Sequence, residues 1–197
     1  MRIADVSVLR GPLGELNDQL FGDNGMERLE ALNLCLKNVT AKILKRVGDI
    51  ALGPVKRFVA VEKFVKSNPK VKFYDFGKNF TNNFLDKIEE NVVAATLVVH
   101  RLIISAHDPE IMVELGVKHR IITLAEFYGA LELQGQPEGL LRVDGWAKFA
   151  YIRDINGNVW AVSADWCAGF GWYVDAIPVG YPPPWRDGCQ VLSRKSV

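Results

Sequence analysis

Hydrophobic residues recur at two different spacings along the chain, and the first is helical. Between residues 26 and 48 they recur every three or four positions, at Leu29, Leu32, Leu36, Val39, Ile43 and Val47. This is the spacing of one helix face, and Gly48 follows it at the position of a C-cap glycine. The pattern predicts an N-terminal amphipathic helix over residues 26–48. Its apolar stripe packs either on the protein's own core or against a second copy in a homo-oligomer.

The middle of the chain mixes strand and helix patterns. Runs rich in β-branched and aromatic residues predict strands over residues 57–67, 71–77 and 92–105, with a short helix over 81–90. His107-Asp108-Pro109 predicts a turn. Thr123 and Glu126 form a capping box that begins a helix ending near Gln134. We therefore expect a mixed middle region that contains an antiparallel sheet.

Strict alternation appears only near the C-terminus, where strands are expected over residues 146–154, 159–167, 172–177 and 190–193. Asn156-Gly157 predicts a two-residue hairpin turn between the first two. In the second strand Trp160, Val162, Ala164 and Trp166 share one face, and Ala161, Ser163, Asp165 and Cys167 share the other. All five tryptophans lie after residue 145. The tryptophans are expected to point inward beneath the β layer.

Taken together, these patterns predict an α+β fold in two parts. Residues 1–140 form an α/β scaffold region that includes the N-terminal helix. Residues 141–197 form a Trp-rich antiparallel β module, after a cluster of glycine and proline between residues 135 and 145.

Charge and hydropathy narrow the class of protein. The net charge of +1 excludes a globally basic or globally acidic chain. No secretory signal is visible, and the most apolar stretch, residues 92–99, is too short for a membrane span. We expect a soluble protein, cytoplasmic by default. Bases are concentrated in residues 41–72, which leaves open a phosphate-backbone binder, although nucleic acid is not the expected partner.

Catalytic and metal-binding motifs are absent from the sequence. Three histidines (His100, His107 and His119) and three cysteines are scattered as single residues, so no metal ion or cofactor is expected. Cys167 and Cys189 either pair in an oxidising compartment or remain free thiols in a reducing one. The one enzyme-like arrangement is a pair of carboxylates, Asp165 and Asp175, on neighbouring strands near Tyr173. It leaves a hydrolase as the alternative function.

The polar face of the C-terminal strands has the chemistry of a binding surface. Tyrosine offers a large rigid contact area, and serine and aspartate offer hydrogen bonds. The segments that suggest a family are residues 149–157, Trp166, Gly171-Trp172, Val174, Ala176 and residues 185–194. They resemble the C-terminal part of the variable target proteins of diversity-generating retroelements, which occur in bacteria.

The resemblance implies a fixed framework that displays variable residues to new ligands. The implied framework is Trp166, Trp172, Val174, Trp185, Gly188 and Val191. The implied ligand-binding residues are Ser163, Asp165, Tyr173, Asp175, Tyr181, Arg186 and Asp187. Many such proteins have a C-type lectin-like fold. We therefore expect a non-enzymatic protein that binds a protein or glycan partner through this surface.

Overall fold

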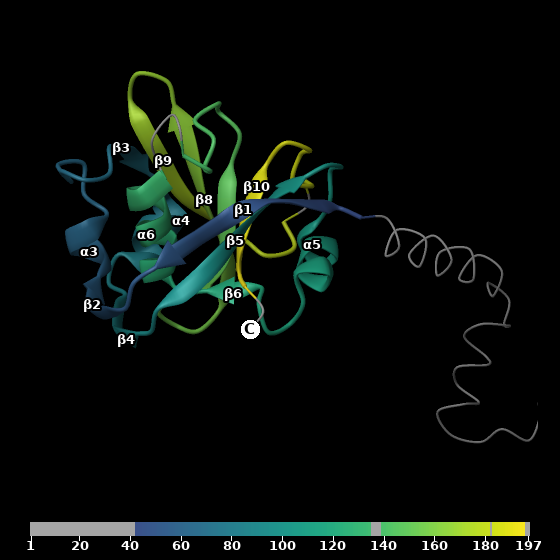
Figure 1. Ribbon diagram of the computed structural model, residues 1–197. Helices are drawn as coiled ribbons and strands as arrows, with labels where there is room; N and C mark the ends of the chain where they lie inside the picture. The colour runs from purple at the N-terminus through teal and green to yellow at the C-terminus, as the bar shows by residue number, and fades with distance from the viewer. Residues whose placement is uncertain (1–41, 135–138, 182, 196–197) are drawn as a thin grey trace, which may run out of the picture. The chain divides into compact units, whose positions relative to one another are not determined.

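The computed structural model describes residues 42–134, 139–181 and 183–195. Most of its strands form one mixed sheet, in the order β1-β5-β10-β7-β8-β9-β3, with β6 paired to β7 (Figure 1). Their bounds are β1 Leu44–Leu52, β5 Ala95–Leu102, β10 Gln190–Arg194, β7 Lys148–Arg153, β8 Val159–Cys167, β9 Gly171–Pro178, β3 Phe73–Phe76 and β6 Ile121–Ile122. A separate antiparallel pair joins β2 (Val55–Val59) to β4 (Ile88–Val92).

Strands from both parts of the chain are interleaved in this sheet. β10 lies between β5, to which it is antiparallel, and β7, to which it is parallel. β3 and β6 also make parallel pairs, with β9 and β7. The α+β class is confirmed, with a mixed sheet. The predicted division at residue 140 does not coincide with a break in the sheet.

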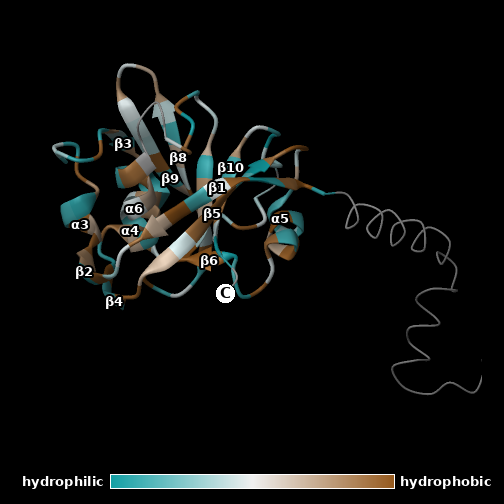
Figure 2. Ribbon diagram, in the orientation of Figure 1, coloured by the Kyte–Doolittle hydropathy of each residue, from teal (hydrophilic) through white to brown (hydrophobic). Residues whose placement is uncertain are grey.

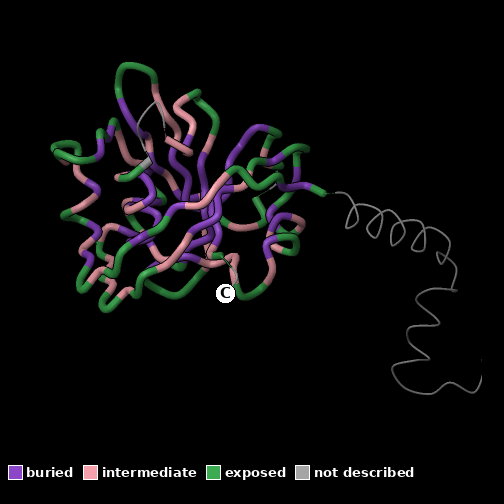
Figure 3. The backbone as a smooth tube through the Cα atoms, in the orientation of Figure 1, coloured by how far each residue is buried: buried purple, intermediate pink, exposed green. Residues whose placement is uncertain are grey.

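Helices cover the sheet over two hydrophobic cores. Figure 3 shows buried backbone running through the central strands. The helices are α3 (Ala60–Lys63), α4 (Lys78–Phe84), α5 (Asp108–Leu115) and α6 (Leu124–Gln134). The larger core gathers residues of α3, α4 and α6, and the smaller core gathers Ile111 and Leu115 of α5. Figure 2 shows both hydrophobic and hydrophilic residues on α5, as expected for a helix with one buried side.

Alternation along the strands divides side chains between the two cores. Ala150 and Ile152 of β7 belong to the larger core, and Phe149 and Tyr151 to the smaller one. Trp172 also lies in the larger core, with Trp160 and Trp166 packed against it, so the predicted inward side is confirmed for these three tryptophans. The prediction is wrong for the other two, because Trp146 is exposed and Trp185 packs against the smaller core. β7 is buried on both faces. The sequence had suggested that the face opposite the tryptophans is exposed to solvent, and for β7 this prediction is wrong.

The predicted helix over residues 26–48 is wrong at its C-terminal end. Residues 44–48 belong to β1, which pairs with β5 over the register Leu44↔Leu102 to Leu52↔Ala95. Pairing with β5 gives these backbone groups their hydrogen bonds, and Leu44 and Ile50 are buried in the sheet. Tertiary pairing therefore overrides the helical spacing of this segment. Residues 26–41 lie outside the described residues.

Several predicted elements of the middle region have other bounds or another type. The expected strand over residues 57–67 ends at Val59 and continues as α3, and the expected helix over 81–90 is replaced by α4 and β4. The predicted turn at residues 107–109 is instead the start of α5. The capping box is confirmed: Thr123 N donates to Glu126 Oε2 at 2.6 Å, and Glu126 N donates to Thr123 Oγ1 at 3.1 Å. No helix of the described residues is long and apolar enough to span a membrane.

Asp154 shapes the hairpin between β7 and β8. The predicted two-residue turn is wrong, because Asp154 N donates to Asn158 O and Gly157 N donates to Asp154 O, which closes a three-residue loop. Gly157 alone takes a positive φ there, of 87°. Both oxygens of the buried Asp154 carboxylate accept hydrogen bonds, from Asn156 N, Asn158 N, Asn158 Nδ2 and Trp160 Nε1.

The first prediction concerns this carboxylate. Burial acts to raise the pKa of Asp154, but hydrogen bonds from Trp160 and Asn158 hold it below its ordinary value. A lowered native pKa stabilises the fold above the unfolded pKa of about 3.9 and loses that effect as pH falls through the native pKa. Asp154→Asn should lower the free energy of unfolding by about 1–2 kcal/mol at pH 7. Urea denaturation should show a smaller deficit at pH 3. Asp86→Asn, at an exposed carboxylate, is the control, and an equal deficit at both pH values would contradict this role.

Candidate functional site

Four of the predicted site residues come together on the β8–β9 pair. The register pairs Ser163 with Asp175 and Asp165 with Tyr173. Residues directly opposite on an antiparallel pair have Cβ atoms about 4.5–5.5 Å apart, and two-residue steps keep all four on one face. We call Ser163, Asp165, Tyr173 and Asp175 the polar patch.

Neighbouring backbone fixes the Asp175 side chain. Its Oδ1 accepts a hydrogen bond from Ala176 N at 2.8 Å, and its Oδ2 accepts one from Tyr173 Oη at 3.4 Å. The carboxyl group lies directly against Gly77, where an added Cβ would overlap it. Glycine at position 77 is therefore needed for this side-chain position. Burial and the adjacent Asp175 raise the pKa of Tyr173, so its hydroxyl keeps its proton and remains a donor.

Asp165 and Ser163 supply the polar groups of the patch that have no internal partner. Within the described residues, neither side chain makes a hydrogen bond or ion pair. Ser163 is only 3% exposed, yet no sealed polar side-chain atom of the described residues lacks a partner, so its Oγ reaches the surface. Burial raises the pKa of Asp165, which Lys148 acts to lower and Asp175 to raise. The patch thus presents a hydroxyl and a partly desolvated carboxyl group.

The patch is narrower than the open face expected from the sequence. Phe149 lies opposite Ser163 on β7, and the Trp185 ring stacks on Phe149 with centroids 3.9 Å apart. Because Ser163 is buried, it adds little contact surface to the patch beyond its hydroxyl oxygen. Asp165, Tyr173 and Asp175 are partly exposed.

The other three predicted site residues lie on the β9–β10 connection. Tyr181, Arg186 and Asp187 are exposed. Among the described hydrogen bonds, this connection is held at the start of α5: Asp187 N donates to Ser105 Oγ at 3.2 Å, and Trp185 and Ala106 exchange backbone hydrogen bonds. These three residues therefore lie on a connection that is held by residues 105 and 106, and not on the β8–β9 pair. No described contact joins them to the polar patch.

Lys148 is a residue that sequence reasoning missed. Its ammonium group is fully buried, donates to Asp144 Oδ1 at 3.2 Å and to Trp146 O, and lies 5.8 Å from the Trp172 ring centroid. Burial lowers the pKa of Lys148. Its position in an alternating strand, on the side that faces the core, is the signal that could have identified it. Lys148 acts on the patch through its charge, because it opposes the rise in the pKa of Asp165.

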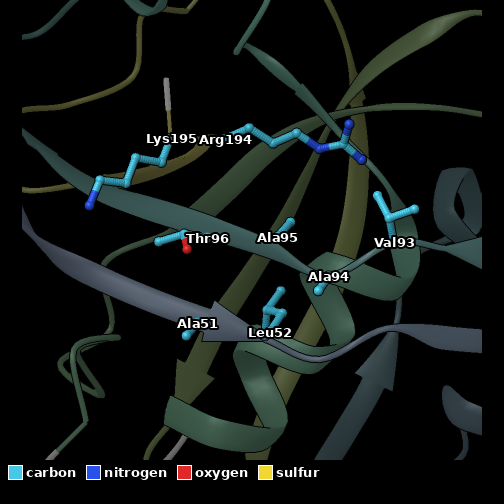
Figure 4. Close-up of a pocket in the computed structure, with 8 residues that line it drawn as sticks. All are labelled: Ala51, Leu52, Val93, Ala94, Ala95, Thr96, Arg194 and Lys195. Atoms are coloured by element: carbon cyan, nitrogen blue, oxygen red, sulfur yellow. The ribbon is translucent and has the colours of Figure 1, made fainter. Parts of the chain in front are cut away.

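Within residues 42–134, 139–181 and 183–195, three cavities lie away from the polar patch. The one in Figure 4, about 580 Å³, lies between the end of β1, the β4–β5 turn and the end of β10. A second, about 200 Å³, lies between Leu52, Val92 and α6, and a third, about 390 Å³, lies between α5, β5 and β10. No cluster of His, Cys, Asp or Glu in the described part of the chain could hold a metal ion. Cys167 and Cys189 are free thiols.

Comparisons of the chain with family models, curated proteins and solved structures find no match.

Proposed function

We propose that this protein binds a ligand without chemical turnover through the polar patch. The observation that carries the proposal is the pairing of Ser163 with Asp175 and of Asp165 with Tyr173, which gathers partly exposed tyrosyl and carboxyl groups. The Ser163 hydroxyl and the Asp165 carboxyl have no internal partner among the described residues. Polar groups at this depth gain most from a partner that a ligand supplies.

The groups of the patch favour a ligand rich in hydrogen-bond donors. Ionised carboxylates only accept hydrogen bonds, so Asp165 and Asp175 suit hydroxyl, ammonium or guanidinium groups. The Tyr173 ring adds a rigid apolar surface beside them. A glycan supplies many hydroxyl groups and a basic protein segment supplies cations. We propose one of these two as the partner.

A hydrolase is the second candidate, favoured by the different surroundings of the two carboxyl groups. Burial raises the pKa of Asp165, whereas Asp175 accepts hydrogen bonds from Ala176 and Tyr173. Acid–base catalysis uses such a difference between paired carboxyl groups. Release of a chromophore from aryl glycosides, lost in both Asp165→Asn and Asp175→Asn, would establish this candidate over simple binding.

The phosphate-binding alternative has less support. Four bases of the 41–72 segment are paired with carboxylates: Arg46 with Asp49, Arg57 with Glu90, Lys66 with Asp75 and Lys70 with Glu132. These pairs partly neutralise the segment, whose bases are spread over several elements.

We also propose that the residues of this surface are diversified, so that related proteins bind different ligands. The resemblance to variable target proteins makes Ser163, Asp165, Tyr173 and Asp175 candidates for variation, together with Tyr181, Arg186 and Asp187. A neighbouring reverse-transcriptase gene with a near-copy of the segment encoding these residues would support it. The C-type lectin-like fold that the resemblance implies stays a prediction.

The second prediction tests the patch with a glycan array and a set of Arg-rich peptides. The wild-type protein should bind one of these two probe sets, and Asp165→Asn and Tyr173→Ala should each weaken binding by about tenfold or more, about 1.4 kcal/mol. Because Tyr173 is partly exposed, Tyr173→Ala should leave the melting temperature nearly unchanged.

Asp86→Asn is the matched control, since Asp86 is an exposed carboxylate on the α4–β4 connection. It should bind as the wild type does. Binding that survives both patch variants, or that Asp86→Asn weakens equally, would contradict the proposal.

A further inference from the structure

Asp75 of β3 lies beside the polar patch, because β3 and β9 are parallel neighbours in the sheet (Figure 1). The register pairs Phe73 with Trp172 and Asp75 with Tyr173, so it shifts at Tyr74. A β-bulge of this kind re-aims the side chain that follows it. Phe73 and Trp172 lie in the larger core, and Asp75 and Tyr173 therefore point to the opposite face, which carries the polar patch.

Tyr173 is flanked by three carboxylates. Asp165 lies opposite it on β8, Asp75 lies opposite it on β3, and Asp175 accepts a hydrogen bond from its hydroxyl at 3.4 Å. Burial raises the pKa of Tyr173, and the charges of all three carboxylates raise it further. No cation among the described residues acts to lower this pKa. The surroundings of Tyr173 are therefore negatively charged.

Two lysines compensate this charge only in part. Lys66 pairs with Asp75 at 3.0 Å, and both side chains are at least half exposed, so the pair is weak. Burial raises the pKa of Asp165 and Lys148 acts to lower it, but the Lys148 ammonium group donates to Asp144 Oδ1 at 3.2 Å. One of the two lysines is thus bound elsewhere, and negative charge remains in excess at the patch.

Ser163 gives evidence for a ligand that is independent of charge. Its side chain is 3% exposed, lies directly opposite Asp175, and forms no hydrogen bond within the described residues. The partly buried Asp165 carboxyl, two residues further along β8, forms neither a hydrogen bond nor an ion pair within the same residues. Polar groups that are removed from water gain most from a new partner. A ligand with several N–H or O–H donors would satisfy both groups.

A cation fits these groups better than a neutral glycan does. Both ligands supply hydrogen-bond donors, but only a cation also compensates the charge of Asp75, Asp165 and Asp175. A guanidinium group carries five N–H donors in one plane, so it reaches several acceptors at once and stacks on aromatic rings. Carboxylates around an exposed tyrosyl ring are therefore matched to guanidinium in both charge and shape.

We propose that the polar patch, extended by Asp75, binds the guanidinium group of an arginine side chain in a basic protein segment. The Asp165 carboxylate and the Ser163 hydroxyl accept hydrogen bonds from its N–H groups. The Tyr173 ring stacks on its plane, and Asp75 and Asp175 supply further negative charge. This inference rests on the proposed function and chooses between its two classes of partner.

The third prediction is tested with three tripeptides that are capped at both ends and differ only in the middle residue, which is arginine, citrulline or lysine. Citrulline has the shape of arginine without its charge. The readout is NMR of the full chain with isotope-labelled tyrosine rings, at constant ionic strength, with signals assigned by single Tyr→Phe variants. Tyr128 is the internal reference, because it is buried in the larger core.

The arginine tripeptide should shift the Tyr173 signal saturably, with a Kd in the millimolar range or tighter, and leave Tyr128 unmoved. Citrulline should bind about tenfold more weakly or worse, and lysine about threefold. Equal affinity for arginine and citrulline, or for arginine and lysine, would overturn the inference.

The same signal separates this inference from the proposed function. If the Tyr173 signal responds to a glycan from the array of the second prediction but not to the arginine tripeptide, the inference is wrong and the proposed function stands. If neither the tripeptide nor any glycan of the array moves this signal, both are wrong.

Lys66→Gln and Lys56→Gln form a matched pair of variants that remove one exposed cation each. Lys66 pairs with Asp75, whereas Lys56 lies on β2, in the separate two-stranded sheet. Lys66→Gln frees the Asp75 carboxylate and should strengthen binding of the arginine tripeptide about twofold or more, and Lys56→Gln should leave it unchanged. Equal affinity in the two variants, or weaker binding in Lys66→Gln, would also overturn the inference. Because the Lys66–Asp75 pair is exposed, its loss leaves the fold intact.

Discussion

Trp172→Ala should lower the free energy of unfolding by about 3–5 kcal/mol. The Trp172 side chain is 1% exposed, in the larger core between the sheet and its helices. Its ring makes an edge contact with Trp166, with centroids 5.2 Å apart, and lies 5.8 Å from the Lys148 ammonium. Truncation would open a large cavity and remove the ring beside a buried cation, two losses that act in the same direction.

Urea denaturation followed by circular dichroism measures this effect. Phe170→Ala is the control, because Phe170 is a neighbouring aromatic residue that is 63% exposed and contacts the exposed Tyr74 ring. The control should cost less than about 1 kcal/mol. Comparable losses in the two variants would mean that Trp172 does not anchor the core.

The C-terminal strands were predictable because their pattern is local. Residues 159–167 form β8 with the predicted bounds, and Trp172, Val174 and Ala176 share the buried face predicted from alternation. The capping box at Thr123 was equally predictable, since its two hydrogen bonds join residues three apart. In each case the residues that decide the structure are close in sequence.

The sheet order was not predictable, because it depends on contacts between distant residues. β10 inserts between β5 and β7, so residues near 191 meet residues near 100 and 149. The same long-range pairing turns residues 44–48 into a strand despite their helical spacing. Packing of α5 and Trp185, which are also distant in sequence, covers the second face of β7. Ser163 is buried on that face, which narrows the predicted binding surface.

The candidate site was only partly predictable, because strand alternation is a local pattern whereas the neighbours of a strand depend on distant residues. Strand alternation placed Ser163, Asp165, Tyr173 and Asp175 on one face, and the register of β8 and β9 brings them together. Alternation could not place the β9–β10 connection, whose position follows from hydrogen bonds to residues 105–108. Nor could it place Asp75 opposite Tyr173, which follows only because β3 and β9 are neighbours.

Asp108→Ala should destabilise the protein about as much as Trp172→Ala, by about 3–5 kcal/mol. The Asp108 carboxylate is 4% exposed and accepts three hydrogen bonds from distant segments. Oδ1 accepts from Tyr151 Oη at 2.9 Å and Trp185 Nε1 at 2.8 Å, and Oδ2 accepts from Gly180 N at 2.8 Å. It thus joins α5, β7 and the β9–β10 connection. Its removal leaves three donors without their acceptor at the edge of the smaller core.

Three further variants separate the loss of these hydrogen bonds from a general effect on α5. Asp108→Asn keeps one acceptor oxygen and should recover part of the lost stability, whereas Tyr151→Phe removes a single donor and should cost about 1 kcal/mol. Glu110→Ala, in the same helical turn, removes the carboxylate that accepts from His107 N and should cost only about 0.5–1 kcal/mol. Hydrogen exchange should become faster at Gly180 and Trp185 in Asp108→Ala, because the connection that carries Tyr181, Arg186 and Asp187 loses its attachment. Unchanged exchange there, with a loss no larger than that of Glu110→Ala, would mean that Asp108 serves only the helix end.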